Sequence, residues 1–177
     1  MTINDIIDRV AQIVGIDETD IAEGSAIQKK LISATNMIYL ELTMQYVHLK
    51  TKEEVAFEDN RLYYDTLSFP VREVLGVRSR GHKLDFTTYP LYIECKNCDS
   101  AEVTYIYFTD ELESGDEVVL PPKFTAYTLA LGVASEYYYR LGLIDEALFY
   151  KTRYDNAISN LNIGLKCGNL PQRKFLG

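Results

Sequence analysis

The sequence has no tryptophan, only two histidines and only three cysteines among its 177 residues. An odd number of cysteines argues against the disulfide framework of a small secreted protein, so a reducing compartment fits better. The first fifteen residues are amphipathic rather than apolar throughout, which argues against a signal peptide. No apolar run approaches the roughly 18 residues of a membrane span. We therefore expect a protein that does not insert into a membrane.

Basic residues are also scarce. The chain has 18 Lys and Arg against 26 Asp and Glu, which gives a formal net charge of −8. This balance argues against a protein that reads or wraps nucleic acid, because such a protein would present a basic face. It still allows a protein that surrounds nucleic acid without binding it. No acidic residue follows Asp155, so residues 163–177 form a basic tail, either solvated or a docking arm for an acidic partner.

Signatures of catalysis and of metal binding are missing as well. We find no GxSxG, HExxH or glycine-rich phosphate loop. His48 and His82 have no nucleophile or carboxylate at a diagnostic spacing, and both are expected at the surface. The acidic run of residues 110–117 lacks the EF-hand spacing, so a solvated loop is preferred to a calcium site. We expect no enzyme activity, no cofactor and no metal.

The pair Cys95 and Cys98 forms a lone CxxC motif. A structural zinc ion needs four ligands, and the remaining cysteine and the two histidines are scattered along the chain. A redox role needs a helix N-terminus or a cationic setting, whereas this pair lies between two strand patterns. Zinc and redox chemistry stay open, but a turn with Asn97 at its tight position is the preferred interpretation.

Residues 120–161 are predicted to form two helices joined by a sharp turn. Pro121 and Pro122 stand at the expected start of the first helix, where proline is tolerated. Gly142 suits the left-handed position just past its end, and Asp145 is expected to cap the second helix. Near the N-terminus, Thr2 and its neighbours predict a capped helix that ends at Gly15, and a longer helix is expected from about residue 25.

Three consecutive tyrosines, Tyr137, Tyr138 and Tyr139, end the first helix of this pair. Successive helical residues turn by about 100°, so the three rings sweep roughly 200° of the helix circumference. A core-facing stripe covers only about 100° or slightly more. At least one ring must therefore point away from the core of its own chain. It is either exposed or buried against another subunit, which makes these tyrosines a candidate subunit interface.

Short alternating patterns fill the stretch between the helices. Residues 54–57 and 61–64 read as a hairpin around Asp59–Asn60, and a turn is expected at Arg80–Gly81–His82. Further strands are expected in 71–78, 84–89, 91–95 and 103–108, and the last of these has the strongest strand composition. The sequence thus predicts an α+β fold. A bundle of about four helices is formed by residues 1–47 and 120–162, and an inserted all-β region of short antiparallel strands by residues 48–119.

The C-terminal helix pair partly resembles a tetratricopeptide repeat at four places: Leu131–Gly132, Gly142, Ala147 and Ala157. Such repeats need about three stacked copies to bury their faces, and only one is present. A non-enzymatic tetratricopeptide-like protein-binding adaptor is therefore the alternative interpretation. In that case the tyrosine cluster would line a groove for a peptide.

A broader resemblance covers most of the chain and depends on the order of four features. These are the helical start through Tyr39–Val47, the segment Leu67–Leu75, Tyr89–Ile93 with Glu102–Tyr107, and Leu120–Lys123 followed by the 126–142 helix and Asp145–Ala147. With these features the chain resembles the head-to-tail connector (adaptor) proteins of tailed bacteriophages and prophages.

The resemblance implies a non-enzymatic virion protein of the phage neck or tail, made in the host cytoplasm. It implies a dodecameric ring below the portal protein, around a channel through which genomic DNA passes without specific binding. Other tail or neck proteins would contact the inserted β region. The C-terminal segment would dock on the portal through Arg173, Lys174, Phe175 and Leu176.

Overall fold

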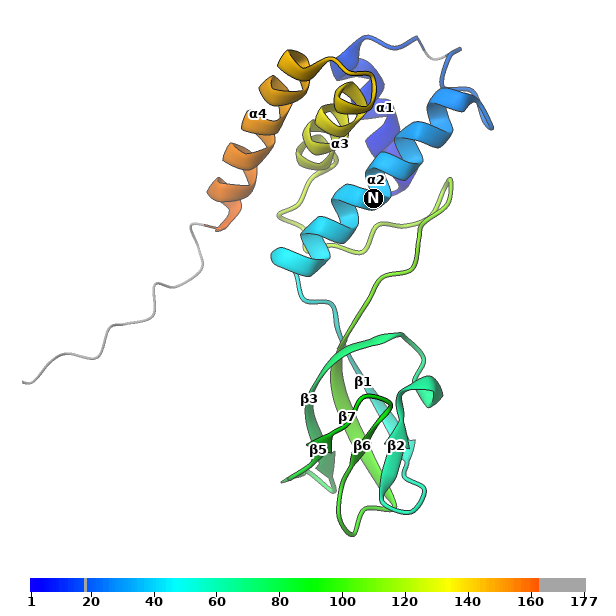
Figure 1. The fold of residues 1–177 in the computed structure, drawn as a ribbon, viewed down its shortest axis with the longest axis vertical. Helices are drawn as coiled ribbons and strands as arrows, with labels where there is room; N and C mark the ends of the chain where they lie inside the picture. The colour runs from blue at the N-terminus through cyan, green and yellow to red at the C-terminus, as the bar shows by residue number, and fades with distance from the viewer. Residues whose placement is uncertain (18, 163–177) are drawn as a thin grey trace, which may run out of the picture. The chain divides into compact units, whose positions relative to one another are not determined.

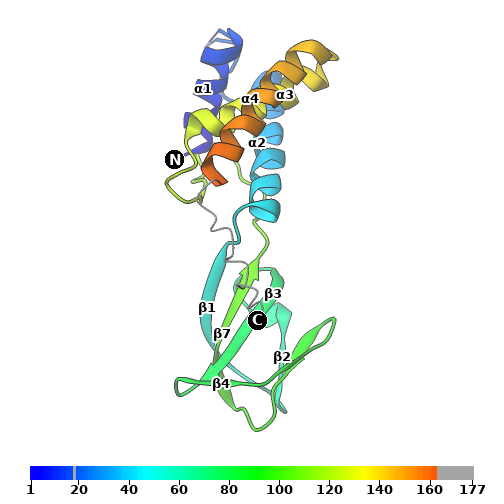
Figure 2. The same cartoon turned by 90° about the vertical axis from the view of Figure 1, so that its left-hand side faces the viewer.

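The computed structural model describes residues 1–17 and 19–162 of the chain. They form two compact units (Figures 1 and 2). The helical unit consists of residues 1–39 and the chain from residue 112 onward, and the β unit consists of residues 40–111. The fold is therefore α+β with a β-rich insertion, as the sequence predicts.

Helix α3 is the centre of the helical unit. The four helices are α1 (Ile3–Val14), α2 (Ala26–Gln45), α3 (Ala126–Arg140) and α4 (Ile144–Asn162). Helix α3 packs against both α1 and α4 (Figure 1). Every residue from Thr128 to Ser135 is buried, so this helix is enclosed on nearly all sides instead of presenting one apolar stripe.

The N-terminal cap of α1 confirms the sequence prediction. The Thr2 hydroxyl accepts a hydrogen bond from the Asp5 amide at 3.2 Å, and the Asp5 carboxylate accepts one from the Thr2 amide at 2.7 Å. The bond that the Asp5 carboxylate accepts from the Thr2 amide lowers the pKa of Asp5, and the Thr2 hydroxyl lowers it further. Gly15 ends the helix with φ of 77° and donates to the carbonyl of Ala11.

Gly142 shapes the corner between α3 and α4, as predicted. Its φ is 77°, in the left-handed region that glycine adopts without strain. Its amide donates to the carbonyl of Tyr139 at 3.0 Å, and the amide of Leu143 donates to the carbonyl of Tyr138 at 3.0 Å. This pair of bonds is a Schellman motif, which satisfies the last carbonyls of α3 and starts α4 almost at once.

Two predictions about helix starts are wrong. The two prolines form a turn ahead of α3, in which the Phe124 amide donates to the carbonyl of Pro121 at 2.9 Å. Helix α3 begins only after Thr125, whose hydroxyl accepts from the Thr128 amide at 3.3 Å and so caps the helix. Asp145 does not cap α4 but lies in its first turn, because the Schellman motif already starts the helix one residue earlier.

The β unit contains two antiparallel sheets. One has four strands in the order β1-β7-β3-β4 (Figure 2), and the other has three in the order β2-β6-β5 (Figure 1). The strands are β1 (Lys50–Ala56), β2 (Arg61–Tyr63), β3 (Val71–Ser79), β4 (His82–Leu84), β5 (Thr87–Thr88), β6 (Tyr92–Glu94) and β7 (Ser100–Tyr107), with a 3-10 helix at Tyr64–Thr66.

The two predicted turns of this unit behave differently. Arg80 and Gly81 have φ of 50° and 82° and join β3 to β4 in a hairpin, as expected. Asp59 and Asn60 also form a tight turn. The strands on its two sides are joined only by a single bridge, between Glu58 and Arg61. The hairpin expected there is wrong, because β1 pairs with β7 and β2 pairs with β6.

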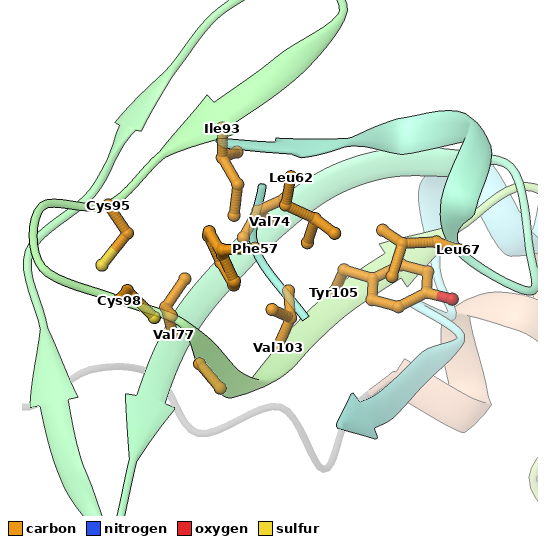
Figure 3. Close-up of a cluster of buried hydrophobic side chains, with 11 residues drawn as sticks. Phe57, Leu62, Leu67, Val74, Val77, Ile93, Cys95, Cys98, Val103 and Tyr105 are labelled. Carbon is orange, nitrogen blue, oxygen red and sulfur yellow. The ribbon is translucent and has the colours of Figure 1, made fainter. Parts of the chain in front are cut away.

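The two sheets enclose one hydrophobic core (Figure 3). Alternate residues of β7, namely Ala101, Val103 and Tyr105, face this core and are at most 3% exposed. Leu62 and Ile93 close it from the three-stranded sheet, and both are at most 2% exposed. The inserted region is therefore a small sandwich with its own core.

Both boundaries of the β unit lie earlier in the chain than expected. The side-chain amide of Asn36 in α2 makes two hydrogen bonds of 2.9 Å with the backbone of Leu112. These bonds place Leu112, where the chain leaves the β unit, in the helical unit. The Arg72 guanidinium donates to the carbonyls of Thr43 and Met44 at 3.2 and 3.1 Å, which ties the end of α2 to the β unit. These long-range contacts leave no local sequence signal.

Candidate interaction surfaces

The three consecutive tyrosines lie in three environments. Tyr137 is 9% exposed, and Tyr138 stacks on Tyr150 of α4 with a centroid distance of 5.5 Å. Tyr139 is 63% exposed. One ring of the three therefore points away from the core of its own chain, as the angular argument predicts. Burial raises the pKa of Tyr138, helped by the neighbouring Tyr150.

Tyr139 belongs to a larger exposed apolar surface, which we call the corner cluster. Its members are between 43% and 63% exposed, and they are Tyr139, Leu141, Leu143, Ile144 and Leu148. They lie in one short stretch of chain around the Schellman turn, where α3 ends and α4 begins. Apolar side chains that are exposed as a contiguous group mark an interaction surface more often than scattered ones do.

Helices α3 and α4 pack closely along their inner faces. An added Cβ at Gly132 would lie 3.0 Å from the ring of Tyr154, which is 1% exposed. The Ser135 hydroxyl donates to the carbonyl of Ala147 at 2.9 Å. The two helices therefore approach each other closely at Gly132 and at Ser135.

A hydrogen-bonded carboxylate anchors the loop after the 3-10 helix to the β sandwich. The Glu53 carboxylate accepts from the buried Tyr105 hydroxyl and, at 3.1 Å each, from the amide and hydroxyl of Ser68. Burial favours a higher pKa for Glu53, but these bonds outweigh it and the pKa is lowered. Burial and the bond to Glu53 raise the pKa of Tyr105 to about 12. Sequence reasoning missed this cluster, because its members are distant in the chain.

The CxxC segment is a turn, as preferred from the sequence. Asn97 has φ of 55°, and the amides of Cys95 and Cys98 donate to the backbone and side-chain oxygens of Asn60 at 2.9 and 3.3 Å. Both thiols are free and buried in the sandwich core (Figure 3). Burial, reinforced by Cys95, raises the pKa of Cys98 to about 11. A thiol with so high a pKa is a poor nucleophile at neutral pH, so the geometry favours a packing role.

The remaining candidates are placed as follows. His48 and His82 are exposed, as predicted. No helix in residues 1–17 and 19–162 is both long and apolar enough to cross a bilayer. The same residues contain no cluster of three His, Cys, Asp or Glu side chains that could hold a metal ion.

The tail residues proposed for portal docking are Arg173, Lys174, Phe175 and Leu176, and all of them lie outside the described part of the chain. Their role stays a prediction.

The chain matches no protein-family model, and no curated protein is significantly similar to it in sequence.

Proposed function

We propose that the chain is a structural virion protein, a head-tail adaptor that forms a ring below the portal of a tailed phage and joins capsid to tail. The observation that carries the proposal is the corner cluster. Its five side chains are each about half exposed, in a helical unit that has a complete core of its own. Covering one such half-exposed side chain would contribute roughly 1 kcal/mol, so a neighbouring copy that covers all five gains substantially.

Charge supports the same role. The net charge of −8 keeps DNA phosphates from adhering to a channel wall, because like charges repel. The sandwich of the β unit has an independent core and can carry a separate contact to the next tail or neck protein. The basic C-terminal tail would dock on the portal protein through its positive charge.

A tetratricopeptide-like adaptor is the alternative. It needs the tyrosine cluster to line an open groove for a peptide. Tyr137 is 9% exposed and Tyr138 is stacked on Tyr150, so only Tyr139 of the three is free for a peptide. The ring proposal needs only that one side of the helix be available to a neighbour, and it therefore fits this arrangement better.

The first experiment is analytical ultracentrifugation of the purified chain, alone and mixed with the portal protein from the same genome. We expect a ring-sized species with the portal. Ile144→Glu with Leu148→Glu should remove it, because two buried charges would replace apolar contacts. The matched control is Leu91→Glu with Val119→Glu, at residues that are 72% and 55% exposed but outside the corner cluster.

Three outcomes separate the possibilities. Loss of the ring only in the corner variant supports the proposal. An unchanged ring in that variant removes the corner cluster from the subunit contact. If neither the wild type nor any variant co-sediments with the portal protein, the result contradicts the adaptor role and favours the peptide-binding alternative.

The tail is tested separately. Deletion of residues 169–177 should leave the far-UV circular dichroism spectrum unchanged and abolish binding to immobilised portal protein. Full retention of the truncated chain on the portal would contradict the docking role of the tail.

A further inference from the structure

The outer face of the four-stranded sheet holds two cations, Arg78 and Lys83, that make no ion pair with the described residues. Arg78 of β3 lies directly opposite Lys83 of β4 in the strand register. Like charges in this position destabilise a sheet. Neither side chain has an ion pair or a hydrogen bond within residues 1–17 and 19–162. Lys52 of β1 lies on the same face and binds Glu102 at 3.2 Å.

These three cations surround a hollow of about 320 Å³. Its lining residues, which we call the basic hollow, are Lys52, Leu75, Gly76, Arg78, Lys83 and Thr104. Lys52, Thr104 and Gly76 form one row across β1, β7 and β3. Gly76 follows an irregularity in the register of β3, and an added Cβ there would meet nothing within 4 Å. The hollow thus has three cations, a hydroxyl and open space, and no acidic side chain lines it.

The charge around the basic hollow selects the kind of anion that fits. A larger hollow of about 1010 Å³ shares Lys52 and Arg78, and its lining includes Glu54, Asp99 and Glu102. A long uniform polyanion such as a nucleic acid backbone would meet these carboxylates as well as the cations, on a chain of net charge −8. A short acidic protein segment can cover the basic hollow alone, so it is the better match.

The chain itself contains such a segment in residues 110–117, which we call the acidic loop. It has five carboxylates and no basic residue: Asp110, Glu111, Glu113, Asp116 and Glu117. Its backbone is fixed by the two bonds between Asn36 and Leu112 and by the Glu113 amide, which donates to Asp116 at 2.7 Å. A loop held in this way loses little conformational entropy when it binds.

The register of β7 places Arg78 of the basic hollow opposite the first half of that strand. Strand β7 runs from Glu102, opposite Arg78, to Tyr107, opposite Val71. At about 3.4 Å per residue this is roughly 17 Å of strand, and the acidic loop follows the far end. A basic surface and an acidic loop of this kind suit pairing between different copies of the chain, because each copy carries both.

We propose that the basic hollow of one copy binds the acidic loop of the next copy, through Arg78 and Lys83 against Glu111 and Glu113. The contact is heterologous, so repeated pairing closes a ring if the rotation between copies allows it. The inference deepens the proposed function, because it rests on the ring and names a polar contact between its subunits in addition to the corner cluster.

The test uses two charge-reversed full-length chains. One carries Arg78→Glu with Lys83→Glu, and the other carries Glu111→Lys with Glu113→Lys. Each alone should associate at least about tenfold more weakly than the wild type in sedimentation equilibrium, because close charge pairs between partners couple strongly. An equimolar mixture should recover association, since each variant then meets an opposite charge. The control Lys50→Glu with Lys96→Glu makes the same change in net charge at exposed residues outside the hollow.

Cross-linking covers the case of weak association. In a background with Cys167→Ser, a chain with Thr104→Cys is mixed with a chain with Glu113→Cys and treated with a short bismaleimide. We expect a product of twice the chain mass that decreases as sodium chloride is raised, because salt screens the contact. Replacing Thr104→Cys by Lys96→Cys should abolish it.

The outcomes distinguish this inference from the proposed function. No cross-linked product, or variants that associate like the wild type while the portal still assembles a ring, would overturn the acidic-loop contact and leave the adaptor role standing. Recovery in the mixture without any portal binding would support the contact and contradict the adaptor role.

Discussion

The hydrogen bond between Tyr105 and Glu53 gives the sharpest quantitative prediction. Tyr105 is 0% exposed, and its hydroxyl links the sandwich core to the Glu53 carboxylate. Tyr105→Phe keeps the ring and removes only this bond, so it leaves no large cavity. A hydrogen bond to a charged group contributes about 1.5–3 kcal/mol, so the variant should lose about 2 kcal/mol of unfolding free energy at pH 7.

The pH dependence supplies the decisive test. The pKa of Tyr105 is raised from 10.0 to about 12, so above pH 10 the unfolded chain loses this proton before the folded chain does. The stabilisation is complete below pH 10 and is lost as the pH rises through about 12. Each pKa unit corresponds to about 1.4 kcal/mol, so the wild type loses about 1.4 kcal/mol by about pH 11 and about 3 kcal/mol in full.

Urea unfolding at pH 7, 9 and 11, followed by circular dichroism, measures this directly. The difference between wild type and Tyr105→Phe should be constant up to about pH 9 and shrink to less than half by about pH 11. The other tyrosines titrate in both proteins and cancel in the difference. Tyr89→Phe, at a residue 39% exposed, is the control and should follow the wild type. A gap between wild type and Tyr105→Phe that stays constant to pH 11 would refute the reasoning.

Three further predictions concern other sites. Gly132→Val should lower the unfolding free energy by about 3 kcal/mol or more in urea titrations, because a Cβ would already lie 3.0 Å from buried Tyr154; a stability equal to wild type would contradict that contact. Asn36→Ala should cost about 2 kcal/mol through the loss of both bonds to Leu112, and Asn36→Asp should recover only part of it, since one donor is still missing. Cys98 should react with maleimide at pH 8 at least about 100-fold more slowly in the native protein than in urea, because it is buried with a raised pKa; equal rates would show that the turn opens freely.

Local rules predicted the ends of several elements well. The capping box of Thr2 and Asp5, the left-handed Gly142 and the Arg80–Gly81 turn each depend on a few neighbouring residues, so the sequence contains the whole cause. The starts of α3 and α4 were misplaced by the same kind of rule, and at α3 an alternative local cap was available. Thr125, for example, competes with the prolines and provides a hydroxyl where they provide none.

Long-range pairing set the limit of the sequence argument. Lys50–Ala56 and Arg61–Tyr63 are neighbours in the chain, yet each pairs with a strand from residues 92–107, because that arrangement brings both apolar faces to one core. The angular sweep of the three tyrosines required an outward ring, but only the packing of α3 on α4 decides that it is Tyr139. The basic hollow depends on the alignment of four strands, which no local pattern specifies.

The division of the helical unit into two stretches of sequence has a kinetic consequence. Helix α1 packs on α3, so this contact forms only after more than a hundred intervening residues have been synthesised. Closing so long a loop is slow in a disordered chain, but the β unit is continuous in sequence and shortens the gap when it folds first. Folding during translation should therefore begin in the middle of the chain and finish at its two ends. In a ribosome-bound chain that has emerged only to residue 112, the β sandwich would already be folded. Helix α1 would not yet be packed, because α3 has not been synthesised.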